Sequence, residues 1–449
     1  MRIQTSTIIA SFVGLGLMAS AAIHAATVCV DPGKPTCEAT VQDGVNAAVG
    51  GDTVSIAKGE FLEGVVIPVG KNGLIIKGNA KGTVLDSAAT GMPGIAILSP
   101  GVSISNLTVR NADGNGIDIQ AGADGVEITK VRIQKSSIDC IETEGHDTVI
   151  EKNTLIGCGY TAVEVINADD LVIRGNTIKH VDEGGIEVSG ERAVIEKNKI
   201  SIVEDGECID VDGGNAEVVG NSMDNCDQFG VKVDGDAPYV AKNRVVGIGG
   251  YDIHCSGDCA NGLVSGNRAS DTGQDADGFV ISADFNGLRV EKNRAERCND
   301  RGFEVAGDGM ITLANNLARD IGGDYGEACY RVDGNGGHLL EANSCDSTHS
   351  DGFQLQSGTG HIIRKNKVVD AFEDGIDVED GVTNVTVSDN KVSAGASGIE
   401  VEVLTTGNVT GNTATGGRVD YCDESAGGVT ATGNKFDTSV AAPCASDVD

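Results

Sequence analysis

Apolar and polar residues alternate in short runs that return along most of the chain. The run GGIEVSG at 184–190 has close relatives at 115–122, 207–213, 229–235, 301–307, 351–358 and 374–381. An apolar residue at every second position predicts a β-strand, and the Gly, Asn and Asp between the runs predict turns. The chain is therefore expected to be all-β.

A second apolar strand follows each run after about ten residues and ends in Asn, as in AVIEKN at 193–198. These Asn lie 22 to 27 residues apart, at positions 153, 176, 198, 221, 243, 267, 293, 316, 343, 366, 390, 412 and 434. A leucine-rich repeat has a similar period, but Val and Ile dominate here. Three short strands fill such a unit, and stacked units lie roughly 4.8 Å apart. The Asn at a fixed place then form an internal ladder, and about 14–16 coils are expected.

These strands, turns and Asn resemble the right-handed parallel β-helix family that includes pectate lyases, rhamnogalacturonases, alginate lyases and epimerases. The resemblance covers about residues 50–435 and implies a β-helix solenoid with a carbohydrate-related function. The stretch ATVQDGVNAAVGGDTVSIAKGEF also resembles this family, with a short amphipathic helix at about 39–49 that covers the open edge of the first coil. We expect a signal peptide at 1–25, a cap at 26–52, the β-helix at 53–435 and a tail at 436–449.

The N-terminus is typical of a secretory signal, with Arg2, the apolar run TIIASFVGLGLMA and small residues up to Ala26. No later stretch approaches the roughly 20 apolar residues of a membrane helix, so no membrane insertion is expected. The protein is expected to be secreted or periplasmic.

The 13 Cys fit an oxidising compartment. Stacked coils bring Cys140 close to Cys158, Cys208 close to Cys226, and Cys329 close to Cys345, so we expect three disulfides between coils. Local or capping disulfides are expected for Cys29–Cys37, Cys255–Cys259 and Cys422–Cys444. Cys298 is left over and is expected to be buried and unpaired.

The formal net charge of −34 is spread along the chain and disfavours nucleic acid and anionic membranes as partners. It also disfavours an anionic polysaccharide unless cations such as Ca²⁺ mediate. The chain has no Trp and only 3% aromatic residues, which is a poor composition for a broad aromatic binding surface.

The repeated phrase G-[IVF]-x-[VIL] places two apolar residues inside the coil, so residue x points outward. The expected row of x residues is Asp118, Glu142, Glu164, Glu187, Asp210, Lys232, Asp252, Val280, Glu304, Arg331, Gln354, Asp377 and Glu400. The expected second row is Gln120, Glu144, Ile166, Ser189, Asp212, Asp234, His254, Ser282, Ala306, Asp333, Gln356, Glu379 and Glu402.

Two coils carry enlarged loops, because the stretch from Asn to the next inward residue grows from about 12 residues to 14 at 267–281 and 16 at 316–332. Loops on a rigid scaffold often hold binding groups. The candidate catalytic residues there and nearby are Glu304, Arg331, Tyr330 and His254. The candidate substrate-binding residues are Lys232, Asp277, Arg301, Asp333 and Gln354.

The reaction type stays open at this stage. In a lyase, Arg331 would neutralise a uronate and His254 or Tyr330 would remove a proton, whereas a hydrolase would need two carboxylates. The crowded carboxylates would also suit Ca²⁺, and DVDGGN at 210–215 makes Asp210 and Asp212 candidate metal ligands. The acidic rows are equally explained as a solvated surface.

No catalytic signature of the resembled enzymes is present. The sequence therefore predicts either an exported, carbohydrate-related β-helix that binds, cleaves or epimerises a polysaccharide, or a non-catalytic structural or surface solenoid.

Overall fold

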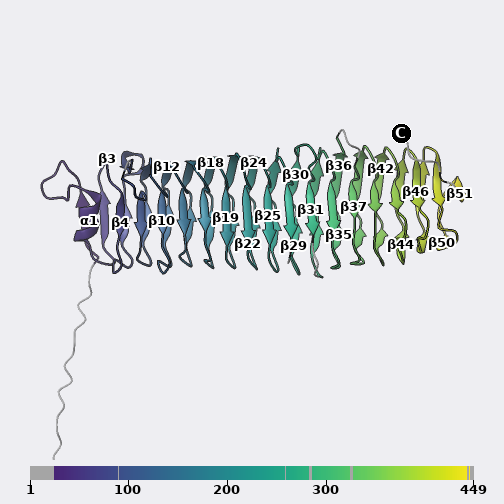
Figure 1. Cartoon of the computed structure of the whole chain (residues 1–449), viewed down its shortest axis with the longest axis horizontal. Coiled ribbons are helices and arrows are strands. Elements are labelled where there is room, and N and C mark those ends of the chain that lie inside the picture. Colours follow the sequence, from purple (N-terminus) through teal and green to yellow (C-terminus); the bar gives the residue numbers. More distant parts are fainter. Residues whose placement is uncertain are drawn as a thin grey trace, which may run out of the picture.

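The computed structural model describes residues 25–441 and 444, except 89, 258, 283–285 and 324–326. Almost all of the expected signal peptide thus lies outside the described residues. The chain winds into about 17 turns. Figure 1 shows that they form one long stack. The predicted β-helix fold is confirmed. The first turns lack the repeated Asn, so the number of coils expected from the sequence, 14–16, was slightly lower than the number of turns in the structure.

Each regular turn contributes one strand to each of three parallel sheets. Within the described residues the first sheet has 17 strands, the second has 18 and the third has 16. The second sheet starts at β1 (Thr27–Val30) and β2 (Thr53–Ile56) and ends at β50 (Val429–Thr432). The third sheet runs from β3 (Gly59–Phe61) to β48 (Thr413–Gly416).

The first sheet carries the repeated phrase, and the candidate site residues lie on its strands or, for Asp277, Arg301 and Asp333, directly beside them. Its strands are β4 (Val65–Ile67), β7 (Ile95–Ile97), β10 (Ile117–Ile119), β13 (Ile141–Thr143), β16 (Val163–Val165), β19 (Ile186–Ser189), β22 (Ile209–Asp212), β25 (Val231–Asp234), β28 (Ile253–Ser256), β31 (Phe279–Ser282), β34 (Phe303–Ala306), β37 (Tyr330–Val332), β40 (Phe353–Leu355), β43 (Ile376–Val378), β46 (Ser397–Val401), β49 (Val419–Asp423) and β51 (Ser439–Ala441). β51 lies within the expected tail and pairs with β49.

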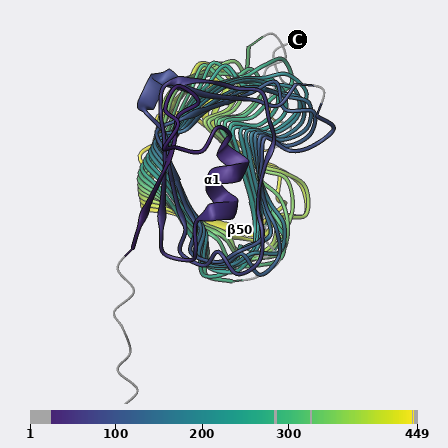
Figure 2. The ribbon, with the colours of Figure 1, turned by 90° about the vertical axis from the view of Figure 1, so that its left-hand side faces the viewer.

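The helix α1 (Val41–Ala47) closes the N-terminal end of the stack. Figure 2 shows it lying across the mouth of the first turn. The Thr40 side chain accepts a hydrogen bond from the Asp43 N–H and so caps the helix. Val41 and Val45 are fully buried, so the apolar face of the helix covers the first turn. The predicted capping helix is confirmed.

The predicted Asn ladder runs between the second and third sheets. Asn221, for example, donates from Nδ2 to the Ile195 carbonyl (2.8 Å) and to Asn243 Oδ1 (3.1 Å). Its own Oδ1 accepts from the backbone N–H and Nδ2 of Asn198. Every ladder Asn from Asn153 to Asn412 is at most 2% exposed, so these amides supply the partners that buried turn backbone needs.

A left-handed residue precedes each ladder Asn and makes the corner between two strands. Its φ lies near that of Lys152 (57°) or Gly175 (64°) throughout the series. Only Gly takes this conformation without steric cost, so the Lys at five of these thirteen corners is held there by the ladder and the paired strands around it.

Val, Ile and Leu fill most of the core. In four consecutive turns near the middle of the stack, aromatic residues replace them at one inward position. Phe279, Phe303, Tyr330 and Phe353 stack in one column, with centroids 4.5–5.0 Å apart. All four rings are fully buried. They occupy the first inward position of β31, β34, β37 and β40, so the enlarged loops lie beside the turns with the largest core residues.

All six predicted disulfides form, and Cys298 is buried and unpaired. Two of the disulfides that link neighbouring coils have Cα–Cα separations of 5.3 Å for Cys140–Cys158 and 5.8 Å for Cys329–Cys345. Their number is consistent with an oxidising compartment. Within the described part of the chain, no helix is both long and apolar enough to cross a membrane.

Candidate functional site

The outward rows of the first sheet follow the predicted order except at one turn. Lys232 pairs in register with His254, and His254 with Val280, so His254 belongs to the first row. Asp252 was placed in that row from sequence but is fully buried. The reason is that the two inward residues of β28 are Ile253 and Cys255. The outward position therefore falls two residues later than expected, at His254.

An aromatic patch lies on the outward face, formed by Phe229, Tyr251 and His254. The ring centroids of Phe229 and His254 are 5.3 Å apart, and Tyr251 lies 5.6 Å from Phe229 and 5.7 Å from His254. The rings are only partly buried. Phe229 and Tyr251 each lie two residues before a strand, β25 and β28 respectively. The stacking of these turns brings the rings together, although the low aromatic content of the chain disfavours a broad aromatic surface.

Burial and the nearby Lys232 ammonium lower the pKa of His254. At neutral pH this imidazole is therefore uncharged and can pack against the two aromatic rings. Lys232 Nζ lies 2.7 Å from Asp210 Oδ2 and 6.0 Å from the centroid of the Phe229 ring. Lys232 thus borders the aromatic patch but already has a carboxylate partner.

The metal ligands proposed from the sequence lie in different surroundings. Asp210 pairs with Lys232, and Asp212 lies exposed two residues further along β22. Across the described residues, no group of three or more His, Cys, Asp or Glu is arranged to hold a metal ion.

An ion-pair cluster follows the aromatic patch toward the C-terminus and is centred on Arg301. The guanidinium lies 3.0 Å from Asp300, 3.1 Å from Glu327, 3.6 Å from Glu304 and 3.7 Å from Asp277. Its side chain is 13% exposed. A cation that already contacts four carboxylates has little capacity left to neutralise an anionic substrate.

Asp277 lies at the bottom of this cluster and is 1% exposed. Its Oδ1 accepts a hydrogen bond from the Arg301 backbone N–H. Burial raises the pKa of Asp277 to about 8 and outweighs both that hydrogen bond and the Arg301 charge. The carboxyl is therefore largely protonated at neutral pH, but it is covered by protein and cannot reach a ligand on the surface.

Arg331 and Glu304 are paired in register on adjacent strands, as predicted. Their closest nitrogen and oxygen atoms are 3.8 Å apart, and Arg331 also donates to Gln356 Oε1. Asp333 accepts a hydrogen bond from the Ser357 hydroxyl, and Gln354 lies next to Arg331 on β40. These residues do lie together, but most are already paired with one another.

Tyr330 cannot act as a base on the outward face. Its ring is part of the core column, and its hydroxyl donates to the Ser344 carbonyl at 3.1 Å. Burial raises its pKa well above the ordinary value. The prediction that Tyr330 is a surface base was wrong. Tyr330 occupies the first apolar position of the repeated phrase G-[IVF]-x-[VIL], and this position points inward.

Acidic residues stack on β13, β16 and β19, and several of their carboxyls have raised pKa values. Glu164 stacks between Glu142 and Glu187 on neighbouring strands. Burial, with the Glu187 charge, raises the pKa of Glu164 to about 7, and burial raises that of Asp139 to about 6. Burial, together with neighbouring acidic residues, thus brings the pKa of some of these carboxyls close to neutral pH.

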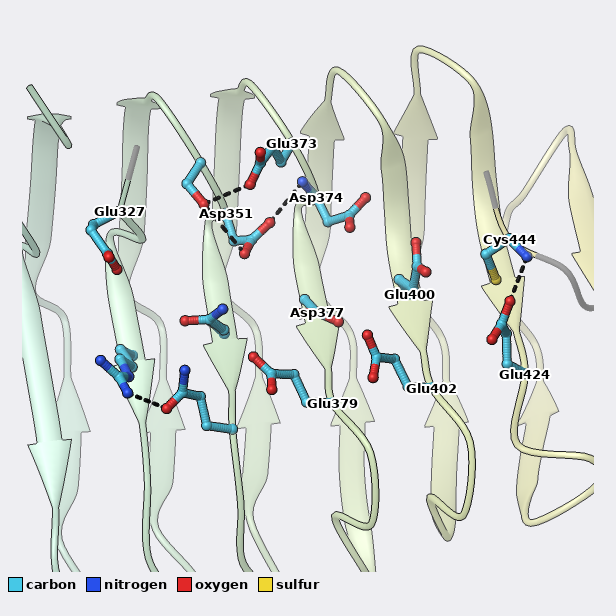
Figure 3. Close-up of a pocket in the computed structure, with 14 residues that line it drawn as sticks. Glu327, Asp351, Glu373, Asp374, Asp377, Glu379, Glu400, Glu402, Glu424 and Cys444 are labelled. Carbon is cyan, nitrogen blue, oxygen red and sulfur yellow. Dashed lines mark hydrogen bonds between the residues drawn. The ribbon is translucent and has the colours of Figure 1, made fainter. Parts of the chain in front are cut away.

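A second acidic region forms a cavity of about 610 Å³ near the C-terminal end of the first sheet. Figure 3 shows its labelled carboxylates side by side along neighbouring turns. The nine that line it are Glu327, Asp351, Glu373, Asp374, Asp377, Glu379, Glu400, Glu402 and Glu424. Arg331 is at one end, and Cys444, held by its disulfide to Cys422, is at the other. The sequence shows the acidic rows but not the hollow between them.

The comparison with family models identifies the class of protein. The model described as "Right handed beta helix region" matches residues 61–201, 139–318 and 325–441. The matches cover well over half of the chain, which therefore belongs to the right-handed β-helix family. No curated protein matches the chain.

Solved structures share the architecture at low sequence identity. The pre-mature bacteriophage phi29 gene product 12 is 10% identical, with a TM-score of 0.56 over 88% of this chain and 65% of that one. A periplasmic alginate epimerase is 12% identical (TM-score 0.42; 66% and 77% covered). A PL6 family polysaccharide lyase from Pseudopedobacter saltans is also 12% identical (TM-score 0.42; 71% and 84% covered). At these identities the likeness concerns the fold alone.

Proposed function

We propose that this chain is an exported β-helix protein that binds a polysaccharide along its first sheet without cleaving it. Export is supported by the secretory pattern at 1–25 and by the six disulfides. The observation that carries the binding proposal is the aromatic patch of Phe229, Tyr251 and His254. Partly exposed rings on adjacent turns offer an apolar face to the C–H groups of a sugar, while the polar rows beside them can bond its hydroxyl groups.

The geometry favours binding over catalysis because the residues needed for a reaction are separated or covered. His254 and Arg331 lie three turns apart, which is about 14 Å at the spacing of paired strands. A base and the cation that must act on the same sugar would need to be closer. Asp277, the protonated carboxyl, is buried beneath Arg301.

The charge distribution favours a neutral or amine-bearing glycan. Both Arg301 and Arg331 are paired with carboxylates, and the two acidic regions lie on either side of the patch. A uronate polymer would meet mainly negative charge along this face.

The test is binding of the mature chain to a panel of neutral, amine-bearing and uronate polysaccharides by affinity electrophoresis. Phe229→Ala and Tyr251→Ala should each weaken retention about three- to tenfold, from the roughly 0.5–1.5 kcal/mol that aromatic contacts contribute. Phe372→Ala is the matched control, because Phe372 is 54% exposed and lies outside the patch.

Equal retention of the patch variants and the wild type would refute the role of the patch. Release of shortened or unsaturated sugars by the wild type would refute the non-catalytic proposal.

A further inference from the structure

The C-terminal cavity differs from the rest of the acidic surface because a nearly buried carboxylate lies at its centre. Asp377 is 8% exposed, and its Oδ1 has no hydrogen-bond partner. Asp377 lines the cavity (Figure 3), and its neighbours in register on the adjacent strands are Gln354 and Glu400. A buried carboxylate oxygen without a partner is costly unless a donor or a cation contacts it.

The groups that face Asp377 are nearly all acidic. Asp351 lies on the preceding turn, Asp374 and Glu379 lie on its own turn, and Glu402 lies on the following one. Arg331 is the one basic residue among the described residues that line the cavity, and it already contacts Glu304 and Gln356.

This crowding raises the pKa of several carboxyls in the cavity. Burial and the four neighbouring acidic groups raise the pKa of Asp377 well above its ordinary value. Burial, with Asp380, raises the pKa of Glu402 to about 7. A cationic ligand would favour the ionised forms, so its binding should release protons.

The size of the cavity indicates what kind of cation fits. A volume of about 610 Å³ is many times that of one ion. The carboxylates repeat at roughly 4.8 Å from turn to turn and at about 6.5 Å between the two rows of one strand. They are not clustered as a metal would require within the described residues. Spaced carboxylates in a long hollow fit a ligand with several ammonium groups, each contacting a different turn.

We propose that this cavity binds a multivalent ammonium ligand, either a free linear polyamine or an amine-bearing stretch of a glycan. Its Asp377, Glu379, Glu400 and Glu402 contact successive ammonium groups. The polyamine source is independent of the polysaccharide proposal above, whereas the glycan source would extend it by naming the class of sugar.

The test is calorimetric titration of the full mature chain at 150 mM salt with spermine as the probe. Parallel titrations use a glucosamine tetramer, its fully N-acetylated counterpart, and CaCl₂. We expect saturable spermine binding, with heats that differ between Tris and phosphate buffers because protons are released. Tighter binding of the glucosamine tetramer than of spermine would assign the glycan source, and the reverse would assign the polyamine source. The acetylated tetramer should not bind the cavity.

The double variant Asp377→Asn/Glu402→Gln should weaken spermine binding at least tenfold. The control is Asp118→Asn/Glu144→Gln, which removes the same charge from the first sheet at its N-terminal end. An equal loss in the control would show a diffuse electrostatic effect and overturn the proposal. Absence of binding, or tighter binding of Ca²⁺ than of spermine, would also overturn it.

Phe229→Ala should leave spermine binding unchanged, which separates failure of this proposal from failure of the polysaccharide proposal. Asp377→Asn removes a carboxyl whose charged form is disfavoured by burial, so its thermal stability at pH 8 should equal or exceed that of the wild type, which shows that the variant folds.

Discussion

Truncating one amide in the middle of the Asn ladder should cost far more stability than truncating the last one. In Asn221→Ala, the side chain loses two donated and two accepted hydrogen bonds. The backbone N–H of Asn198 loses its acceptor, and the Ile195 carbonyl loses a donor. Asn221 is 1% exposed, so water cannot replace the lost partners. At about 1–3 kcal/mol for each buried group left unsatisfied, we expect a loss of about 2–6 kcal/mol.

Asn434→Ala is the matched control because Asn434 occupies the same place in the final ladder turn. Its Nδ2 donates to the Val409 carbonyl, and its Oδ1 accepts from the Asn412 N–H and Nδ2. Asn434 is only partly buried, so water can take over these bonds. We expect its truncation to cost less than about 1.5 kcal/mol.

Amide hydrogen exchange is the appropriate assay, because a long repeat array can open locally without unfolding as a whole. The Asn198 amide should exchange at least about tenfold faster in Asn221→Ala than in the wild type, and amides several turns away should change much less. An unchanged Asn198 amide, or an equal effect of both substitutions on urea unfolding, would refute this account of the ladder.

Three further outcomes are expected. Phe303→Ala, which opens a gap in the ring column between Phe279 and Tyr330, should destabilise the fold by about 3–5 kcal/mol in urea unfolding, and Phe303→Leu by clearly less. Asp277 binds its proton more tightly in the folded chain than in the unfolded one, so it makes stability fall as the pH rises from about 4 to 8. The melting temperature of Asp277→Asn should therefore fall less over that range, and parallel pH curves would contradict the assignment. Cys298 is buried and is the one thiol outside the six disulfides, so a thiol reagent should label one site per chain only after denaturation. Rapid labelling of the native protein would contradict its burial.

Sequence spacing could predict the fold because the same short-range rules repeat in every turn. The steps between Asn fix the length of a turn, the alternating runs fix which side chains point inward, and three of the Cys spacings agree with stacked coils. The helix α1 follows from its Thr40 cap and the apolar positions Val41 and Val45.

The site was harder to predict because it depends on how turns of different length align. In β28 the two inward residues are Ile253 and Cys255, two positions later than expected, so His254 takes the outward place expected for Asp252, and Asp252 is buried. Tyr330 was assigned to the surface for its chemistry, although its place in the phrase implies the core. The aromatic patch and the acidic cavity are each formed by residues from several turns. A local sequence pattern therefore does not predict either surface.

The register of one strand per turn fixes the distance between the aromatic patch and the cavity. β28 and β43 are five turns apart, or about 24 Å along the axis. Each strand from β28 to β43 pairs with the next, so the strand register fixes this separation. It can change only in steps of about 4.8 Å, by gain or loss of a complete turn of some 22–27 residues. The number of turns encoded between the two surfaces therefore sets their distance. A duplication of one turn would move the aromatic patch and the cavity apart by one strand spacing without changing the residues of either.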